Sequence, residues 1–251
     1  MLEVCDLSVS YGKKEVLTNV SFTLEKGTVT ALLGANGCGK TTLIKALCGL
    51  LPCGGERVLD RQDLRSLSVK ETARQIGYIP QRSGISLALT ALDVVLMGFS
   101  PRLGLLQQPT KAMEELAKKT LAELDLSADA AYLTLSEGQK QLCVLARTLV
   151  MDAKVLLLDE PESALDLQNR YGLFERLRDR LQDRAVLAVL HDPQLALQTA
   201  DRLLLLKDGT IFADLSPRKD SLDTMEQALC GIYGKVRLHK IEDTIVMIKG
   251  S

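Results

Sequence analysis

The stretch "LLGANGCGKTTLIKAL", Leu32 to Leu47, places three glycines, a lysine and two adjacent threonines where an apolar run meets a helix-like run. Glycines at both ends of a turn let the backbone curl around an anion with its N–H groups pointing inward. The spacing Gly34-x-x-x-x-Gly39-Lys40-Thr41 is that of a phosphate-binding P-loop, in which Lys40 reaches the terminal phosphates and the Thr41 hydroxyl can bind Mg²⁺. The alternative is a glycine-rich turn without a ligand. A buried-strand pattern before the motif and a helical pattern after it favour nucleotide binding.

The composition is that of an ordinary globular protein. Of 251 residues, 46% are hydrophobic, which is ample for a packed core. Lys and Arg number 31 against 32 Asp and Glu, so the net charge is -1 and no overall basic field attracts nucleic acid. We therefore expect no nucleic-acid partner. The longest apolar stretches, such as "VLLL" and "LCVLA", are far too short to span a bilayer, so we do not expect the chain to cross a membrane by itself.

The pattern along the chain predicts a largely parallel sheet flanked by helices. Residues 1–33 contain alternating or apolar runs that predict strands, and helix-like and strand-like runs alternate from Thr41 onward. Residues 84–150 interrupt this alternation with three helix-like runs and no convincing strand, which predicts a helical insert. The alternation then resumes, with "KDG" as a hairpin turn. After Ser216 we expect a small appendage of one helix and two strands.

Polar side chains follow several of the predicted strands. The run "KVLLLDE" ends in Asp159 and Glu160, "IGYIPQ" ends in Gln81, and "AVLAVLHD" brings His191, one of only two histidines. In an open parallel sheet, ligands bind beyond the carboxyl ends of the strands, where these residues and the P-loop would meet. Asp159 suits Mg²⁺, Glu160 suits an attacking water, and the His191 imidazole could donate to a phosphate. Alone, each would more often be a surface or structural residue.

The segment "TLSEGQKQL" predicts the start of a helix. Ser136 and Gln139 have the spacing of a capping box in front of an apolar-periodic run. A helix N-terminus with an exposed serine and free N–H groups is also an anion site, so the segment has both a structural and a functional interpretation.

The order of these motifs resembles that of the ATP-binding cassette (ABC) ATPases. It comprises the P-loop, Gln81, "LSEGQ" at Leu135–Gln139, "VLLLDE" at Val155–Glu160, "SALD" at Ser163–Asp166, and His191. The resemblance extends to about residue 215, and the joint occurrence is far more specific than the P-loop alone.

The resemblance implies an α/β fold with a P-loop NTPase (RecA-like) core, an N-terminal antiparallel β-subdomain and a helical subdomain that carries the ABC signature. The ABC ATPase domain would occupy residues 1–215, with the helical subdomain inserted at about 84–150. Residues 216–251 would form a small C-terminal appendage.

The same resemblance implies ATP and Mg²⁺ as cofactors and gives each site residue a role. Tyr11, unless it only packs in the core, would stack on adenine. The phosphates would be cradled by Gly34, Asn36, Gly37, Cys38, Gly39, Lys40, Thr41 and Thr42, and Mg²⁺ would be bound by Thr41, Gln81 and Asp159. The catalytic residues would be Glu160 as general base, His191 at the γ-phosphate and Gln81 at the attacking water. Ser136, Gly138 and Gln139 would act on the nucleotide of a second copy, and Asp166 would link the paired sites.

Partners also follow from the resemblance. Two cassettes would pair head to tail and open after hydrolysis. The segment "LTALDVVLMGFSPRLGLLQQPT" at residues 89–110 resembles the importer branch for iron–siderophore, haem and cobalamin uptake, and would contact a transmembrane permease. A substrate-binding protein would be an indirect partner, and the chain would lie in the cytoplasm, peripheral on the inner face of the cell membrane.

Three features lead to further expectations. Glu137 replaces the usual glycine of the signature, and Glu162 replaces the usual threonine after Glu160-Pro161; both would add negative charge near the polyphosphate and slow turnover. Restoring glycine at 137 should then raise ATPase activity. Cys38 lies near a helix N-terminus, which should favour its thiolate, although it can also be only a small residue that fits. A thiol reagent should then inactivate the enzyme unless ATP is bound.

Two other functions are compatible with the same motifs. One is a soluble ABC ATPase without a transporter, such as an assembly scaffold. The other is a nucleotide-gated binding protein with little turnover, which the two extra glutamates favour and the presence of Glu160 and His191 opposes.

Overall fold

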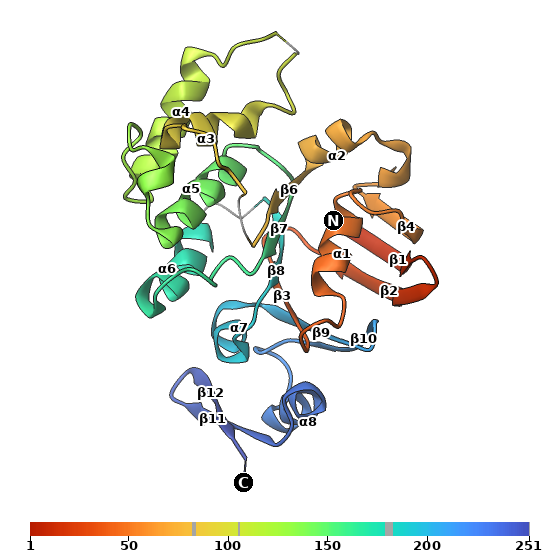
Figure 1. Ribbon diagram of the computed structural model, residues 1–251. Helices are drawn as coiled ribbons and strands as arrows, with labels where there is room; N and C mark the ends of the chain where they lie inside the picture. Colours follow the sequence, from red (N-terminus) through yellow and green to blue (C-terminus); the bar gives the residue numbers. More distant parts are fainter. Residues whose placement is uncertain (82–83, 105, 179–182, 251) are drawn as a thin grey trace.

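A six-stranded sheet forms the centre of the protein in the computed structural model, which describes residues 1–81, 84–104, 106–178 and 183–250 (Figure 1). The strand order is β10-β9-β3-β8-β7-β6, and all neighbours are parallel except the β9–β10 pair. The strands are β3 (Val29–Leu33), β6 (Ile76–Ile79), β7 (Val155–Asp159), β8 (Ala185–Val189), β9 (Arg202–Lys207) and β10 (Thr210–Leu215). The predicted parallel α/β core is confirmed.

Both faces of this sheet are buried, as the continuous apolar runs of its strands predict. Every residue of β3, β7 and β8 is buried. Because successive side chains point to opposite faces, Ala31 and Leu158 join one core cluster while Leu32 and Leu157 join the other. The two clusters attach separate layers to the sheet.

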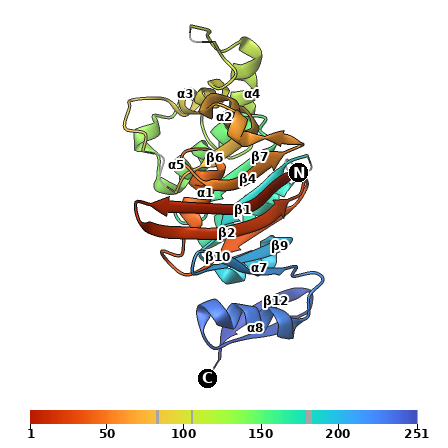
Figure 2. The same ribbon diagram turned by 90° about the vertical axis from the view of Figure 1, so that its right-hand side faces the viewer.

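An antiparallel sheet, in the order β2-β1-β4-β5, covers one side of the core (Figure 2). Its strands are β1 (Leu2–Tyr11), β2 (Lys14–Leu24), β4 (Gly54–Leu59) and β5 (Gln62–Asp63). Helix α1 (Lys40–Leu47) lies between the two sheets, since its Leu43 shares a cluster with Leu7 of β1 and Leu157 of β7. The predicted β-subdomain is thus confirmed, and Lys14 pairs with Tyr11 where the chain turns from β1 into β2.

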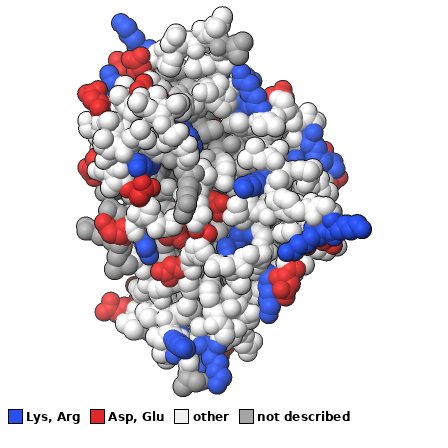
Figure 3. All heavy atoms as spheres, viewed as in Figure 1, with Lys and Arg blue, Asp and Glu red and all other residues white. Residues whose placement is uncertain are grey.

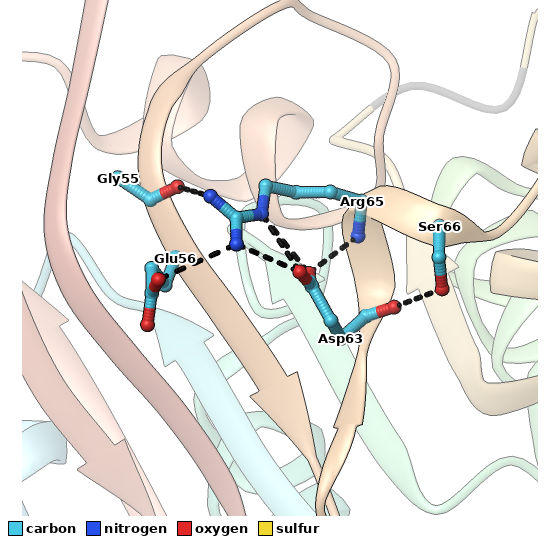
Figure 4. Close-up of polar contacts among 5 residues, drawn as sticks. All are labelled: Gly55, Glu56, Asp63, Arg65 and Ser66. Carbon is cyan, nitrogen blue, oxygen red and sulfur yellow. Dashed lines mark hydrogen bonds and ion pairs between the residues drawn. The ribbon is translucent and has the colours of Figure 1, made fainter.

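A polar cluster fixes the end of this subdomain before the chain enters the 3-10 helix η1 (Leu64–Ser66) (Figure 4). Asp63 Oδ1 accepts the backbone N–H of Arg65 at 2.9 Å, and Arg65 Nη2 lies 2.7 Å from Asp63 Oδ2. Arg65 Nη1 also donates to the Gly55 carbonyl at 3.1 Å, which ties the turn to β4. Helix α2 (Val69–Gln75) follows directly.

The described residues between 84 and 150 form helices and connecting loops, as the sequence predicts. Their elements are α3 (Ala91–Leu96), η2 (Met97–Phe99), α4 (Lys111–Ala122), η3 (Tyr132–Thr134) and α5 (Glu137–Leu149). Within the described part of this segment, the β-structure is limited to a single bridge between Thr90 and Ala131. Arg74 Nε donates to the Pro101 carbonyl at 2.7 Å and Lys70 Nζ to the Leu103 carbonyl at 3.1 Å, so α2 holds one end of the helical segment on the core.

The C-terminal part packs on the core as a separate small unit, at the bottom of Figure 1. After α6 (Leu167–Arg178) and α7 (Pro193–Thr199) come α8 (Leu222–Tyr233) and the hairpin of β11 (Val236–Ile241) and β12 (Thr244–Lys249). Met225 and Leu229 of α8 are fully buried in the main cluster. The Gln194 amide of α7 donates to the Ile245 carbonyl and accepts from the Met247 N–H, each at 2.7 Å, which fastens β12 to α7.

Charges of both signs are interspersed on the surface. Figure 3 shows Lys and Arg side chains among Asp and Glu on one face of the molecule. None of the helices in the described residues is long and apolar enough to cross a bilayer.

Candidate functional site

The P-loop connects β3 to α1, and its glycines are needed for steric reasons. A Cβ on Gly34 would lie 2.4 Å from the Leu206 carbonyl oxygen, and one on Gly39 would lie 2.7 Å from Leu17. Gly39 and Gly37 also have positive φ values of 111° and 78°. Residues with a side chain rarely adopt such a backbone, so the loop takes its shape because these positions are glycine.

Lys40 and Thr41, the first residues of α1, carry the polar groups of the loop. Lys40 is 6% exposed, and its Nζ donates to the carbonyls of Gly34 at 2.7 Å and Ala35 at 3.1 Å. The Thr41 hydroxyl lies 3.3 Å from Asp159 Oδ1 at the end of β7. The structure therefore joins two of the three predicted Mg²⁺ ligands.

Asp159 is more enclosed than the sequence indicates. It is 3% exposed, and burial raises the pKa of its carboxyl, while a hydrogen bond from Thr41 acts in the opposite direction. Burial, together with the negative charge of nearby Asp159, raises the pKa of the Tyr78 hydroxyl in β6. Tyr78 was missed as a neighbour of the site; its position in the strand that leads to Gln81 was the only available signal.

Glu160 lies between Gln81 and His191 at the ends of the central strands. Its φ is 53°, a left-handed conformation that is strained for a residue with a side chain and is common at functional sites. The residue is 8% exposed; Gln81 Nε2 donates to its Oε2, and His191 Nε2 lies 2.5 Å from its Oε1. The structure thus brings together the three predicted catalytic residues, which are 31 to 110 positions apart, on the loops that follow β6, β7 and β8.

The two unusual glutamates differ from what their charge alone led us to expect. Glu162 is 3% exposed, and its Oε1 accepts the backbone N–H of His191 at 3.0 Å. Glu137 is exposed and pairs with Lys140 at 2.8 Å, which offsets its charge. Its expected effect on turnover stays a prediction.

The signature residues make no hydrogen bond to Gln81, Glu160 or His191 within the described residues. Ser136 caps α5: its Oγ accepts the Gln139 N–H at 3.2 Å, and its own N–H donates to Gln139 Oε1 at 3.0 Å. The capping box is confirmed. A Cβ on Gly138 would lie 3.1 Å from the Ala164 carbonyl oxygen, so α5 begins beside the "SALD" segment. In the described part of the chain, the hydrogen bonds of Ser136 stay within its own helix turn.

The other predicted residues differ in how exposed they are. Tyr11 ends β1 and is 50% exposed, while Asn36 and Asp166 are exposed and Thr42 is partly buried. The expected thiolate at Cys38 is wrong, because burial raises the pKa of this thiol and the positive charge of Lys40 opposes that rise only in part. Helix N-terminal polarity does not overcome desolvation here.

Oxygen ligands at this site fit Mg²⁺ as it usually binds beside a nucleotide. Among the described residues there is no group of three or more His, Cys, Asp or Glu side chains that could hold a metal. A threonine hydroxyl against a single buried carboxylate is an incomplete set of ligands, and Mg²⁺ commonly takes its remaining ligands from water and the substrate's phosphates.

Comparison with known proteins identifies the family. The ABC transporter family model matches residues 17–163. The chain belongs to the ABC transporter family. It is therefore an ATP-hydrolysing cassette.

Individual relatives match over most of their length. The cassette is 36% identical over 247 residues to the hemin import ATP-binding protein HmuV of Vibrio cholerae, covering 95% of this chain and 94% of that protein. It is 38% identical over 222 residues to a Helicobacter pylori protein named "Probable iron chelatin transport ATP-binding protein", covering 86% and 87%. A solved ATP-binding subunit of an ABC transporter superposes with a TM-score of 0.79 at 26% identity, covering 91% of this chain and 99% of that one. The RecA-like fold of the cassette is confirmed.

Proposed function

We propose that this cassette hydrolyses ATP to power the import of an iron complex, a siderophore or haem, or of cobalamin, through a separate membrane permease. The observation that carries the catalytic part is the position of Glu160, held between Gln81 and His191 beside the P-loop. The substrate class rests on similarity to proteins named for iron chelatin and hemin transport.

Glu160 is the general base in this proposal. A carboxylate accepts a proton from the attacking water, and the Gln81 amide orients both the water and the carboxylate. The His191 imidazole, 2.5 Å from Glu160, contacts the γ-phosphate. Lys40 exchanges its two loop carbonyls for phosphate oxygens when ATP binds, because its Nζ already lies at the mouth of the loop.

Thr41, Gln81 and Asp159 are the residues that would hold Mg²⁺. When bound, Mg²⁺ neutralises charge on the phosphates. The Thr41 hydroxyl contacts Asp159, which brings two of these three residues together. Tyr11, exposed at the end of β1, stacks on adenine.

A second cassette completes each site. Ser136, Gly138 and Gln139 form a helix start that, within the described residues, makes no hydrogen bond to the P-loop of its own chain. A helix N-terminus attracts anions, so the signature of one copy binds the γ-phosphate held by the other. Asp166 follows Leu165, which lies near Gly138 of the signature, and links the two sites of this head-to-tail dimer.

An apolar groove gives the permease a surface to bind. A cavity of about 310 Å³ lies where α2 faces the helical segment. Its lining includes Leu50, Val69 and Met97, which are 50%, 56% and 37% exposed, together with Pro101. Hydrophobic side chains exposed side by side in a groove suit an amphipathic helix of a partner.

This position would make the cassette a peripheral protein at the inner face of the cell membrane. The same groove is lined by part of the segment predicted to face the permease (residues 89–110), namely Met97, Gly98, Ser100 and Pro101. Leu105 of that segment lies outside the described residues. A substrate-binding protein would act only through the permease.

A pull-down tests the transport function. The tagged cassette is recovered from detergent-solubilised membranes of its own cell, and proteins bound to it are identified by mass spectrometry. A Val69→Glu variant, which places a charge in the apolar groove, is the matched control. We expect a polytopic membrane protein with the unaltered chain and its loss with the variant. Only soluble partners, together with retained ATP hydrolysis, would instead support the non-transport function.

A further inference from the structure

Glu162 is a buried carboxylate next to Glu160 and His191. It is 3% exposed, and its Oε1 accepts the main-chain N–H of His191 at 3.0 Å. Its Oε2 is buried and makes no hydrogen bond to the described residues. Burying a carboxylate with one oxygen unsatisfied lowers the stability of the fold. A glutamate at this position therefore calls for a benefit other than stability.

The backbone around Glu162 is fixed by two turns. The Ser163 N–H donates to the Glu160 carbonyl at 3.2 Å, and the Leu165 N–H donates to the Glu162 carbonyl at 3.0 Å. The position of the carboxylate is therefore set by the segment that also carries the general base. Its hydrogen bond then fixes the peptide of His191, which comes from the loop after β8.

His191 is held at two points as a result. Its main chain is fixed by Glu162, and its imidazole meets Glu160 at 2.5 Å. The side chain of His191 is 45% exposed, so packing alone holds it weakly. Without the contact from Glu162, the His191 loop has more freedom to turn the imidazole away from the γ-phosphate position.

We propose that Glu162 is a positioning residue for ATP hydrolysis, whose buried carboxylate fixes the main chain of His191 and so keeps the imidazole on Glu160. This inference rests on the proposed role of His191 at the γ-phosphate. It replaces the simpler view that Glu162 repels the phosphates, because the carboxylate faces a backbone amide and is shielded from solvent.

The two views predict opposite results for substitution. Glu162→Gln keeps an acceptor oxygen and removes the charge. Glu162→Leu removes the acceptor and puts an apolar side chain of similar size in its place. We expect Glu162→Leu to lower kcat about tenfold, because a loosely held imidazole loses about the worth of one hydrogen bond to the transition state, with KM for Mg-ATP unchanged within about twofold. We expect Glu162→Gln to rescue most of that rate. Repulsion predicts instead that both variants hydrolyse ATP faster than the unaltered chain.

A double-mutant cycle separates positioning from a general structural effect. The residual phosphate release of His191→Ala is followed in long incubations, with and without Glu162→Leu. We expect no further loss, since Glu162 acts through His191. Equal rates for the leucine and glutamine variants, or a further loss in the His191→Ala chain, would overturn the inference. Full activity of His191→Ala would refute the proposed role of His191 itself, so the two failures are distinguishable.

A measurement on the unaltered chain does not depend on how the variants fold. The His191 main-chain amide is followed by hydrogen exchange in a ¹⁵N-labelled sample. We expect exchange slower than that of an unstructured peptide, because the N–H is bonded to a buried carboxylate. Exchange at the unstructured rate would mean that the hydrogen bond is absent, and the inference would fail.

Discussion

Replacing Glu160 by glutamine removes the general base while the shape of the side chain is kept. The amide fits the same nearly buried position, and the P-loop residues that bind the nucleotide are not touched. We therefore expect Glu160→Gln to bind Mg-ATP with a Kd within about threefold of the unaltered value and to hydrolyse it very slowly, because the lost interaction acts only in the transition state.

The size of the effect follows from what surrounds Glu160. Of the neighbouring carboxylates, Asp159 is engaged by the Thr41 hydroxyl, and Glu162 faces the backbone of His191. Neither is positioned to take over as base. A positioned general base contributes about 10²–10⁴-fold, so kcat should fall by that factor, or about 3–5 kcal/mol at 1.36 kcal/mol per tenfold.

The assay is steady-state phosphate release at saturating Mg-ATP, paired with direct nucleotide binding. Glu56→Gln is the matched control, since Glu56 is an exposed glutamate of the polar cluster in Figure 4 and its side chain is 59% exposed. The control should keep the unaltered rate. A kcat for Glu160→Gln within threefold of the control would refute the assignment of Glu160 as base.

Four further results are expected. Lys40→Ala should raise the Kd for ATP at least about tenfold in equilibrium binding, because a charge-assisted contact to phosphate is lost; an unchanged Kd would contradict its role. Alkylation of Cys38 should accelerate as pH rises, because burial raises the pKa of its thiol, and should be slowed by bound Mg-ATP; equal rates with and without nucleotide would count against its place in the loop. Gln194→Leu should speed tryptic cleavage of the C-terminal hairpin, because both hydrogen bonds to β12 are lost, and cleavage at the unaltered rate would contradict that contact. Hydrogen bonds from the N-terminal ammonium and Lys154 lower the pKa of Asp60 from 3.8 to about 2, so its stabilising effect is complete above pH 3.8 and is lost as pH falls through 2. Asp60→Asn should therefore flatten the acid unfolding curve over this range, and superimposable curves would contradict the ion pair.

Short-range sequence signals predicted much of the fold because they depend on local physics. The glycine spacing of the P-loop and the capping box at Ser136 are each set by a few adjacent residues. The continuous apolar strands likewise report burial on two faces. The meeting of Gln81, Glu160 and His191 was predicted from one topological rule, that strand ends share an edge of the sheet.

Features that depend on three-dimensional packing were not accessible in the same way. The sequence shows Glu162 as an added charge, and only the fold turns its carboxylate toward the His191 amide. Proximity to a helix N-terminus predicted a thiolate at Cys38, but desolvation has the larger effect. The Gln194 contact to β12 joins residues about 50 positions apart through one side chain, for which the sequence carries no periodic signal.

The claim that ATP is enclosed between two copies of this cassette can be tested directly by the mass of Glu160→Gln in light scattering, with and without Mg-ATP. Slow hydrolysis should keep the nucleotide in place, so we expect the mass of one chain without ATP and of two chains with it. Adding Ser136→Arg to the same chain should abolish the change, because the signature of the partner would no longer accommodate the γ-phosphate. A mass of one chain under both conditions, with ATP binding intact, would contradict the head-to-tail dimer.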